Sequence, residues 1–397
     1  MHLTDTRHVP QASVLVPDLR RHAFDTAAAK RALPENIEAL RRAGLFRILQ
    51  AERSGGFEES LHVHLDVVAE TSRGCGSTGW VLGVMHAHAW LMGTFPGPAQ
   101  ADVYDTNPDA RLSAVLAPRG KAVATEGGYR LSGFWPFCSG VHHSQWLILG
   151  AMIEPGRAGG DASVAPPEPG IFLLPAQEAA IQNDWDVAGL AGTGSNSVVV
   201  KDVFIPAHRF VPVQALQEGQ APGLGLHRTT LYHSAAVPVL ALFLCGPAIG
   251  IARNAFEVFK SRLAGRTVAF TLGQKQSESA VTQLELADAA TRIDTADMLL
   301  HALVDEVEHY AGRRELMPVE RRAKARMDCA FAMRLCLEAV DSLYIASGGS
   351  GLANTNPLQL ASRDLHAVNM HGLLTLKTNL ETYGRILAGL PSNSPTL

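Results

Sequence analysis

The two ends of the chain carry apolar residues at helical spacing. Between residues 18 and 103 the apolar positions recur every three or four residues, and Gly79 to Thr94 is apolar almost throughout, which predicts a buried helix. After His227 the same period continues in four long segments, enough for an antiparallel four-helix bundle. The four helices are expected at Ala235 to Ala264, Ser277 to Ala311, Arg321 to Ser347 and Asp364 to Leu387.

The middle of the chain has the pattern of short strands separated by glycine and proline. Gly127-Gly128 predicts the two-residue turn of a β-hairpin, and the Gly- and Pro-rich piece Glu154 to Gly170 predicts a surface loop. Mostly local connections predict an antiparallel barrel or sandwich. The strands are expected at Leu112 to Leu116, Ala122 to Glu126, Tyr129 to Phe134, Trp146 to Ile153, Gly170 to Leu174 and Ser197 to Ile205.

These patterns predict an α+β protein of three parts. They are an N-terminal helical domain at residues 1–108, a middle antiparallel β domain at residues 109–212 and a C-terminal four-helix bundle at residues 213–397. Hydrophobic residues make up 47% of the chain and charged residues 18%, as in an ordinary globular protein. The net charge is −4 and lysine and arginine do not cluster, which argues against a nucleic-acid partner.

One stretch, Ala235 to Ala252, is apolar for 18 residues, the threshold length of a membrane span. It contains two prolines and two glycines and stands alone, so a buried helix is favoured and no membrane is expected. The N-terminus lacks a cationic apolar signal segment, which predicts a cytoplasmic address. The five cysteines are scattered without CxxC or CxxH spacing and predict reduced thiols, with no metal site.

Two histidines interrupt the apolar segment Gly79 to Thr94. His86 and His88 are two positions apart, so on a helix their rings diverge by about 200° and cannot both face one ligand. One is expected to face a pocket and bind substrate while the other packs in the core. The pattern leaves open which one, and we favour His88.

The stretch GGYRLSGFWPFCSGVHHSQW, Gly127 to Trp146, brings an indole, a thiol, a hydroxyl and a glycine together within six positions. Such a piece suits close approach of the backbone to a flat ligand, and it equally suits a hairpin with a buried Trp135. The stretch resembles the flavin-contacting segment of two-component (group D) flavin-dependent monooxygenases with the acyl-CoA dehydrogenase fold, the family that includes p-hydroxyphenylacetate 3-hydroxylase. Further segments match at Ser72 to Pro96, Trp185 to Pro206 and Ser362 to Leu390.

The resemblance implies that the chain is the oxygenase component of a two-component monooxygenase. Reduced FMN or FAD would bind between the β domain and the bundle, O₂ would add at the flavin C4a carbon, and the hydroperoxide would hydroxylate a small aromatic substrate, expected to be phenolic. Gly189 to Ser195 (GLAGTGS) precedes a strand rather than opening a helix, so no GxGxxG site for NADH is expected. A separate NAD(P)H:flavin reductase would then supply the reduced flavin. The resemblance also implies a homotetramer whose flavin site is partly built by a neighbouring subunit.

The alternative is an acyl-CoA dehydrogenase-like flavin oxidase or desaturase, or a non-catalytic binding member of the fold. A dehydrogenase needs a carboxylate to remove the proton α to the thioester. The run after Arg363-Asp364 contains no further acid before Gly372, and Thr229 to Ala252 contains none at all. The absence of a base in either segment argues against dehydrogenation.

The resemblance puts His371 where the dehydrogenases carry their acid, facing substrate and flavin; the residues alone would suggest a core histidine. Proton transfer from a phenol to imidazole is uphill by roughly 5 kcal/mol, so roles as base, hydrogen-bond donor and proton donor all stay open. Ser139 matches the residue near flavin N5. Further cofactor candidates are Trp135 and Phe137 as pocket walls, Ser113, Thr193 and Ser195 as weaker contacts, and Arg262 or Arg266 for the flavin phosphate.

Overall fold

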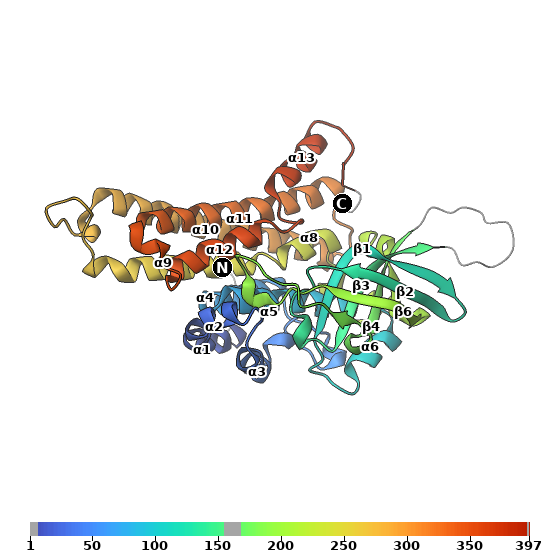
Figure 1. Ribbon diagram of the computed structural model, residues 1–397. Coiled ribbons are helices and arrows are strands. Elements are labelled where there is room, and N and C mark those ends of the chain that lie inside the picture. Colours follow the sequence, from blue (N-terminus) through green and yellow to red (C-terminus); the bar gives the residue numbers. More distant parts are fainter. Residues whose placement is uncertain (1–6, 155–167, 395–396) are drawn as a thin grey trace.

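A computed structural model describes residues 7–154, 168–394 and 397 (Figure 1). Helices form the N-terminal part and the long bundle, and the strands lie together beside them at one end of the molecule (Figure 1). Most of the predicted surface loop Glu154 to Gly170 lies outside the described residues.

The N-terminal helices surround one predominantly apolar helix, α5 (Gly76–Gly93), which has every residue after Gly76 buried. A helix that is apolar on every side must be covered on every side, and α5 packs against α4, the bundle helix α9 (Gly246–Arg262) and the first strand. The predicted buried helix is therefore confirmed. The other helices are α1 (His8–Arg21), α2 (Ala23–Ala28), α3 (Pro34–Arg42), α4 (Leu61–Gly74) and α6 (Gly97–Tyr104).

The strands form one seven-stranded mixed sheet in the order β5-β6-β2-β1-β3-β4-β7. The expectation of a purely antiparallel barrel or sandwich is wrong, because β1 and β3 pair in parallel. The segment from β2 to β3 passes the start of β1, so β3 joins the sheet on the far side of β1. The strands are β1 (Leu112–Thr125), β2 (Gly128–Trp135), β3 (Trp146–Glu154), β4 (Pro169–Pro175), β5 (Ala180–Ile181), β6 (Val198–Pro206) and β7 (Phe210–Pro212).

Two details of the hairpin differ from the prediction. The first two expected strands are one strand, β1, whose pairing with β3 shifts register between Val115 and Gly120. The hairpin turn is Glu126-Gly127 rather than Gly127-Gly128, since Thr125 pairs with Gly128. Gly127 has φ +75°, a left-handed conformation that glycine adopts without steric cost.

The C-terminal helices form the bundle, but two of the four expected helices are broken. The first ends at Leu242 and restarts at Gly246, where Pro247 fits only the first turn of a new helix. The last is interrupted between Asn369 and Leu376, where the Leu373 N–H donates to the imidazole Nδ1 of His371 (3.3 Å). The helices are α7 (Val213–Gln217), α8 (Ala236–Leu242), α9 (Gly246–Arg262), α10 (Ala280–Gly312), α11 (Val319–Ala346), α12 (Pro357–Asn369) and α13 (Leu376–Leu387).

Among the described residues, one helical segment, Ala236–Gly265, is long and apolar enough to cross a membrane. Of its most apolar window, 89% is buried inside the protein. This burial is that of a core helix, and the segment belongs to the largest hydrophobic core, which joins the N-terminal helices to the bundle.

Candidate functional site

A chain of hydroxyl groups ends at Ser139, in the segment between β2 and β3. Thr193 Oγ1 and Ser195 Oγ are 2.7 Å apart, and Ser195 Oγ is 2.7 Å from Ser139 Oγ. The indole N–H of Trp80, from α5, donates to Ser139 Oγ (3.2 Å). Thr193 and Ser195 are buried, whereas Ser139 is half-buried, so Ser139 is the member of the chain that reaches accessible surface.

The turn that carries Ser139 is tied down from two sides. Ser113, on β1, donates its hydroxyl proton to the Ser139 carbonyl (2.7 Å) and lies 2.6 Å from the hydroxyl of Ser144. From the other side, the Gly140 N–H donates to the Thr193 carbonyl (3.0 Å). Gly140 has φ +71°, so the sharp change of direction after Ser139 depends on glycine. The position of the Ser139 hydroxyl is therefore fixed by its backbone as well as by its own hydrogen bonds.

Phe137 is the exposed aromatic residue of this turn. It is 68% exposed and adopts φ 65°, which is unusual for a residue with a bulky side chain. Its ring meets that of Trp185 edge-on, with centroids 6.1 Å apart. An apolar ring held out of the core beside Ser139 is free to cover the face of a flat ligand.

The expected contact of Trp135 with a cofactor is wrong. Trp135 is completely buried, and its indole N–H donates to the Gly150 carbonyl (2.7 Å) inside the sheet core. A Cβ at Gly120 would lie 2.2 Å from this ring and one at Gly133 would lie 2.6 Å from it, so both glycines make room for the indole. Trp135 therefore holds the hairpin together, as in the alternative interpretation of the motif.

Three of the weaker cofactor candidates act behind Ser139. Ser113 and Thr193 are at most 1% exposed, and both hydroxyl groups have protein partners. Ser195 is buried between Thr193 and Ser139. The expectation that Ser113 and Thr193 contact the cofactor directly is wrong, because burial leaves their side chains no surface to offer. Both belong to the hydrogen-bond network that holds Ser139.

The two arginines proposed for the phosphate lie away from Ser139 within one chain. Arg262 donates to Asn356 Oδ1 (3.3 Å) and to Ser350 Oγ (3.2 Å), and Arg266 donates to the Ser347 carbonyl (2.7 Å). Both arginines lie at or just after the end of α9, and their partners lie between α11 and α12, at the end of the bundle remote from the sheet (Figure 1). One chain does not bring these arginines together with Ser139.

His86 and His88 divide as the helical spacing requires. His86 is fully buried; its Nε2 contacts the Leu45 carbonyl (2.5 Å) and its Nδ1 lies 2.9 Å from that of His64. His86 is therefore the one of the two that packs in the core, so of the two candidates left open as the substrate-binding histidine, His86 is the wrong one. His88 contacts the Leu112 carbonyl through Nδ1 (2.9 Å), and its Nε2 makes no hydrogen bond within the described part of the chain.

His88 and His371 are held in opposite tautomers when neutral. A carbonyl can only accept, so Nδ1 of His88 carries the proton and Nε2 is left with a free lone pair. In His371 the backbone N–H of Leu373 donates to Nδ1 (3.3 Å), so the proton is on Nε2. The structure thus offers one acceptor, His88, and one donor, His371, and the His371 ring lies 5.9 Å from that of Trp80.

Burial keeps these histidines neutral at physiological pH. It lowers the pKa of His86, His88 and His371 to about 4 in each case. Asp364 shifts the other way, since burial raises its pKa to about 6. Asp364 accepts a hydrogen bond from Leu190 N (2.6 Å), so the single acid between Ser362 and Thr375 is already engaged.

These shifts make stability dependent on pH in a defined window. Unfolded histidine titrates near pH 6.5, so between about pH 6.5 and 4 the unfolded chain binds more protons and the free energy of unfolding falls as the pH falls. His86 and His88 each contribute up to about 3 kcal/mol to the loss, partly offset below about pH 6 by Asp364. Urea-unfolding midpoints measured at about pH 7.5, 6 and 5 should decrease steadily. Equal midpoints at the three pH values would contradict neutral burial of these rings.

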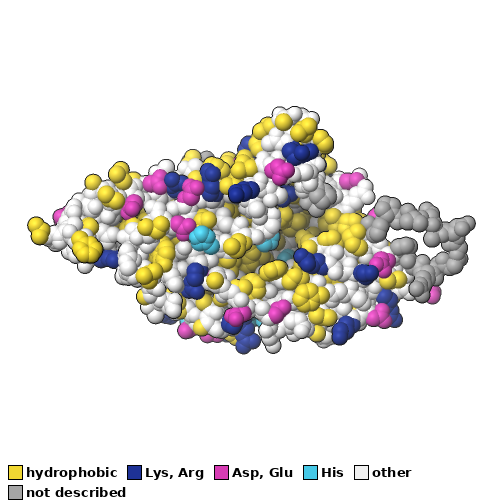
Figure 2. All heavy atoms as spheres, turned by 45° about the horizontal axis from the view of Figure 1, so that its top comes forward, with side chains coloured by type: hydrophobic (Ala, Val, Ile, Leu, Met, Phe, Trp, Pro, Cys, Tyr) yellow, Lys and Arg dark blue, Asp and Glu magenta, His cyan; other side chains and the backbone are white. Residues whose placement is uncertain are grey.

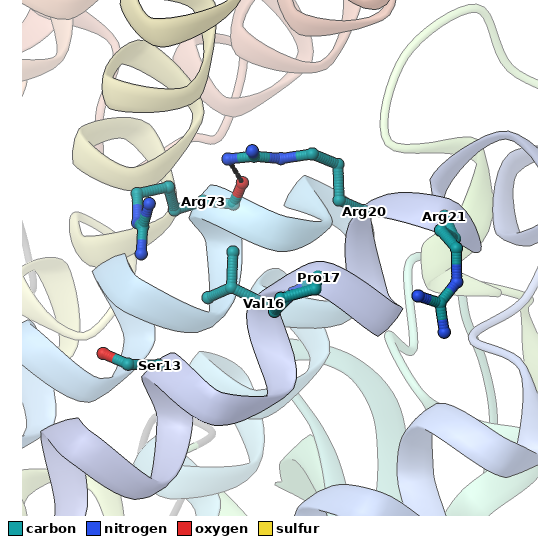
Figure 3. A pocket seen from close by; sticks show the side chains of 6 residues that line it. All are labelled: Ser13, Val16, Pro17, Arg20, Arg21 and Arg73. Carbon is teal, nitrogen blue, oxygen red and sulfur yellow. Dashed lines mark hydrogen bonds between the residues drawn. The ribbon is translucent and has the colours of Figure 1, made fainter.

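A surface hollow elsewhere contains none of the candidate residues. It is formed by α1 and α4, and its arginines are engaged: Arg20 donates to the Arg73 carbonyl (3.3 Å) and pairs with Glu257 (2.8 Å). Its lining residues are Ser13, Val16, Pro17, Arg20, Arg21 and Arg73 (Figure 3). By contrast, Figure 2 shows a hollow between the projecting α13 region and the sheet, in which hydrophobic and histidine side chains are visible.

Sequence reasoning missed two residues that build the site. Trp80 was noted only as part of an apolar helix, yet its N–H reaches Ser139. Asp364 entered the prediction only as part of the Arg363-Asp364 pair, although it holds the segment before β6. The sequence feature that could have pointed to Asp364 is the glycine-rich run GLAGTG. Glycines at this spacing indicate a backbone that packs closely against its neighbours, and Asp364 is one of those neighbours. Among the described residues no group of three or more His, Cys, Asp or Glu side chains is placed to hold a metal.

The donor set fits a flavin. The edge of an isoalloxazine ring alternates donors and acceptors. Thr193 donates its hydroxyl proton to the Leu190 carbonyl. Ser195 therefore donates to Thr193, and Ser139 donates to Ser195. The Ser139 oxygen is thus left as an acceptor, which suits a flavin N–H. The exposed Phe137 adds apolar surface for the ring face.

Known proteins resemble this chain over nearly its whole length. The family model "Acyl-CoA dehydrogenase, C-terminal domain" matches residues 242–375. The oxygenase subunit HsaA of a flavin-dependent monooxygenase from Rhodococcus jostii (strain RHA1) is 33% identical over 95% of this chain and 97% of its own length. The oxygenase component of an FADH(2)-dependent resorcinol hydroxylase from Rhizobium sp. (strain MTP-10005) is 34% identical over 93% and 94%. The crystal structure of 3-HSA hydroxylase from Rhodococcus sp. RHA1 superimposes with a TM-score of 0.91 at 31% identity, covering 99% of this chain and 100% of that one.

Proposed function

The chain belongs to the oxygenase subunits of flavin-dependent monooxygenases with the acyl-CoA dehydrogenase-like fold, and on this premise we propose that it hydroxylates a small phenolic compound with reduced flavin and O₂. A separate NAD(P)H:flavin reductase would supply the flavin, as the names "oxygenase subunit" and "oxygenase component" of the relatives imply. The observation that carries the proposal is the half-buried Ser139 hydroxyl at the end of a hydrogen-bond chain. It accepts from the indole of Trp80, and the ring of Trp80 in turn lies 5.9 Å from that of His371.

Reduced flavin, when bound, would supply the electrons that activate O₂. Ser139 would bind the flavin edge, and Phe137 and Trp80 would limit access of water to it, because an activated oxygen species is lost when water reaches it. FMN and FAD both satisfy these contacts. An FADH(2)-dependent relative favours FAD.

The tautomers assign roles to the two histidines. His88 would accept the hydrogen bond of the phenolic O–H through its free Nε2. His371 would donate a hydrogen bond through Nε2–H to the oxygen derived from O₂. His88 lies in the same part of the fold as Ser139. It contacts the carbonyl of Leu112, and the next residue on β1, Ser113, donates a hydrogen bond to the Ser139 carbonyl. A neutral donor and a neutral acceptor suit a substrate that both gives and receives hydrogen bonds at one hydroxyl group.

The experiment separates supply of reduced flavin from direct use of NAD(P)H. The purified chain with NADH, flavin and a panel of phenols should give no product, and addition of a flavin reductase, or of chemically reduced FMN or FAD in oxygenated buffer, should give hydroxylated phenol. The control is the same mixture without the chain, which consumes O₂ but forms only hydrogen peroxide. Desaturation of an acyl thioester without any phenol hydroxylation would support the dehydrogenase-like alternative instead.

We also propose a homotetramer in the cytoplasm with a three-part chain at residues 1–108, 109–212 and 213–397. The order of helices, strands and helices along the chain supports the division. A neighbouring subunit is the expected route by which Arg262 and Arg266 reach a flavin phosphate, since both lie remote from Ser139 within one chain. Light scattering of the purified protein tests the tetramer.

A further inference from the structure

The segment Gly189–Ser195, here called the strap, is clamped between three helices. A Cβ at Gly189 would lie 2.0 Å from the Arg363 carbonyl oxygen on α12. A Cβ at Gly192 would lie 2.4 Å from Thr26 Cγ2 on α2 and 2.9 Å from Ser77 Cβ on α5. Real Cβ atoms do not approach so closely, so the glycines of GLAGTG are required by packing. The motif that resembled a nucleotide fingerprint is thus a packing device.

Asp364 fixes the beginning of the strap. Its carboxylate Oδ1 accepts from the backbone N–H of Leu190 at 2.6 Å, and its side chain is only 4% exposed. Leu190 has φ 51°, a left-handed conformation that is strained for a residue with a side chain of this size. Such a conformation persists only when neighbours enforce it, and Asp364 provides that constraint. The Trp185 indole N–H, which donates to the Ala191 carbonyl (3.0 Å), holds the next residue.

The strap transmits this position to Ser139 through consecutive hydrogen bonds. The Leu190 carbonyl accepts from Thr193 Oγ1 (2.8 Å), Thr193 bonds to Ser195 (2.7 Å), and Ser195 bonds to Ser139 (2.7 Å). Asp364 is itself on α12, whose end leads directly to His371. One carboxylate therefore connects the helix before His371 to the hydroxyl chain that ends at Ser139.

We propose that Asp364 is a positioning residue for the monooxygenase reaction, holding the Ser139 hydroxyl in register with His371 by way of the strap. The catalytic part of this inference rests on the proposed function. The structural part, that Asp364 holds the strap, does not. Loss of the hydrogen bond from Leu190 N–H to Asp364 should loosen the strap and let Ser139 move relative to His371. Reduced flavin and O₂ should then yield oxidised flavin and hydrogen peroxide instead of hydroxylated product.

Asp341 provides the matched control. It lies on α11 and accepts from Ser362 Oγ (2.9 Å), and it pairs with His366 (3.1 Å), so it also holds α12. Both of these partners are on α12 rather than on the strap. Removing Asp341 tests whether any weakening of α12 has the same effect as removing Asp364.

The first readout uses the protein without flavin. Hydrogen–deuterium exchange of the peptide covering residues 186–197 should be about tenfold faster in Asp364→Ala than in the wild type, the factor expected from losing one buried hydrogen bond. Exchange in Asp341→Ala should match the wild type there. Asp364→Asn keeps an oxygen that accepts from Leu190, so it should restore most of the protection. Unchanged exchange in Asp364→Ala, or Asp364→Asn as fast as Asp364→Ala, would overturn the proposal.

The second readout is the ratio of hydroxylated product to hydrogen peroxide per reduced flavin. It should fall several-fold in Asp364→Ala, recover in Asp364→Asn, and stay unchanged in Asp341→Ala. A fall of equal size in Asp341→Ala would reduce Asp364 to a general stabiliser of α12 and overturn its positioning role. Should the wild type hydroxylate no phenol at all, the proposed function fails, while the exchange measurement still decides whether Asp364 holds the strap.

Discussion

Replacing His88 by asparagine is expected to lower the rate of phenol hydroxylation by about 10²–10⁴-fold while the protein remains folded. The amide nitrogen of the new side chain takes the place of Nδ1 and can still donate to the Leu112 carbonyl, which the histidine contacts at 2.9 Å. No atom takes the place of Nε2, so the acceptor proposed for the phenolic O–H is removed. Product formation with excess reduced flavin and O₂, together with the thermal unfolding temperature, measures the two effects separately.

His371→Asn is the matched companion of this variant. Its side-chain oxygen replaces Nδ1 as acceptor for the Leu373 N–H, and the Nε2–H donor is lost. We expect His88→Asn to weaken binding of the phenol itself, and His371→Asn to raise the hydrogen peroxide yield with less effect on phenol affinity. His88→Gln restores an acceptor near the Nε2 position and should recover part of the activity. Full activity of His88→Asn would remove this histidine from the reaction.

The order of the elements was predictable because hydrophobic spacing reports burial directly. The all-apolar run ending at Thr94 could only be a covered helix, and its residues are buried as expected. The parallel pairing of β1 with β3 was not predictable, because periodicity shows which face of a strand is buried but not which neighbour it pairs with. The break after Asn369 was not predictable, because it depends on the His371 imidazole competing with the helix for the backbone N–H of Leu373. The spacing of hydrophobic residues does not report such a side-chain hydrogen bond.

The motifs predicted which segments come together, but not which of their side chains remain accessible. Ser139 was identified through its motif and lies half-buried with its hydroxyl in a network. Trp135, in the same motif, belongs to the sheet core because Gly120 and Gly133 leave room for an indole there. Those glycines flank it across two strands, and only pairing brings them together. Which of His86 and His88 is free likewise depended on Leu45 and Leu112, both remote in sequence.

Gly189→Ala is expected to destabilise the protein by about 1–3 kcal/mol and to impair coupling of flavin oxidation to hydroxylation. The added Cβ would meet the Arg363 carbonyl oxygen at 2.0 Å, and backbone on both sides cannot rotate away as a flexible side chain would. Either the strap or α12 must shift, and either shift separates Ser139 from His371.

Gly372→Ala makes the same chemical change next to His371, where a Cβ would meet nothing within 4 Å, and it should change stability by less than about 0.5 kcal/mol. Urea unfolding of both variants at neutral pH gives the comparison. If the two variants were equally stable, α12 and the strap could not be in the close contact that this site requires. A second outcome is that Gly189→Ala alone is destabilised but still hydroxylates phenol without excess hydrogen peroxide. The close contact between the strap and α12 would then stand, and it would serve stability rather than the placement of Ser139.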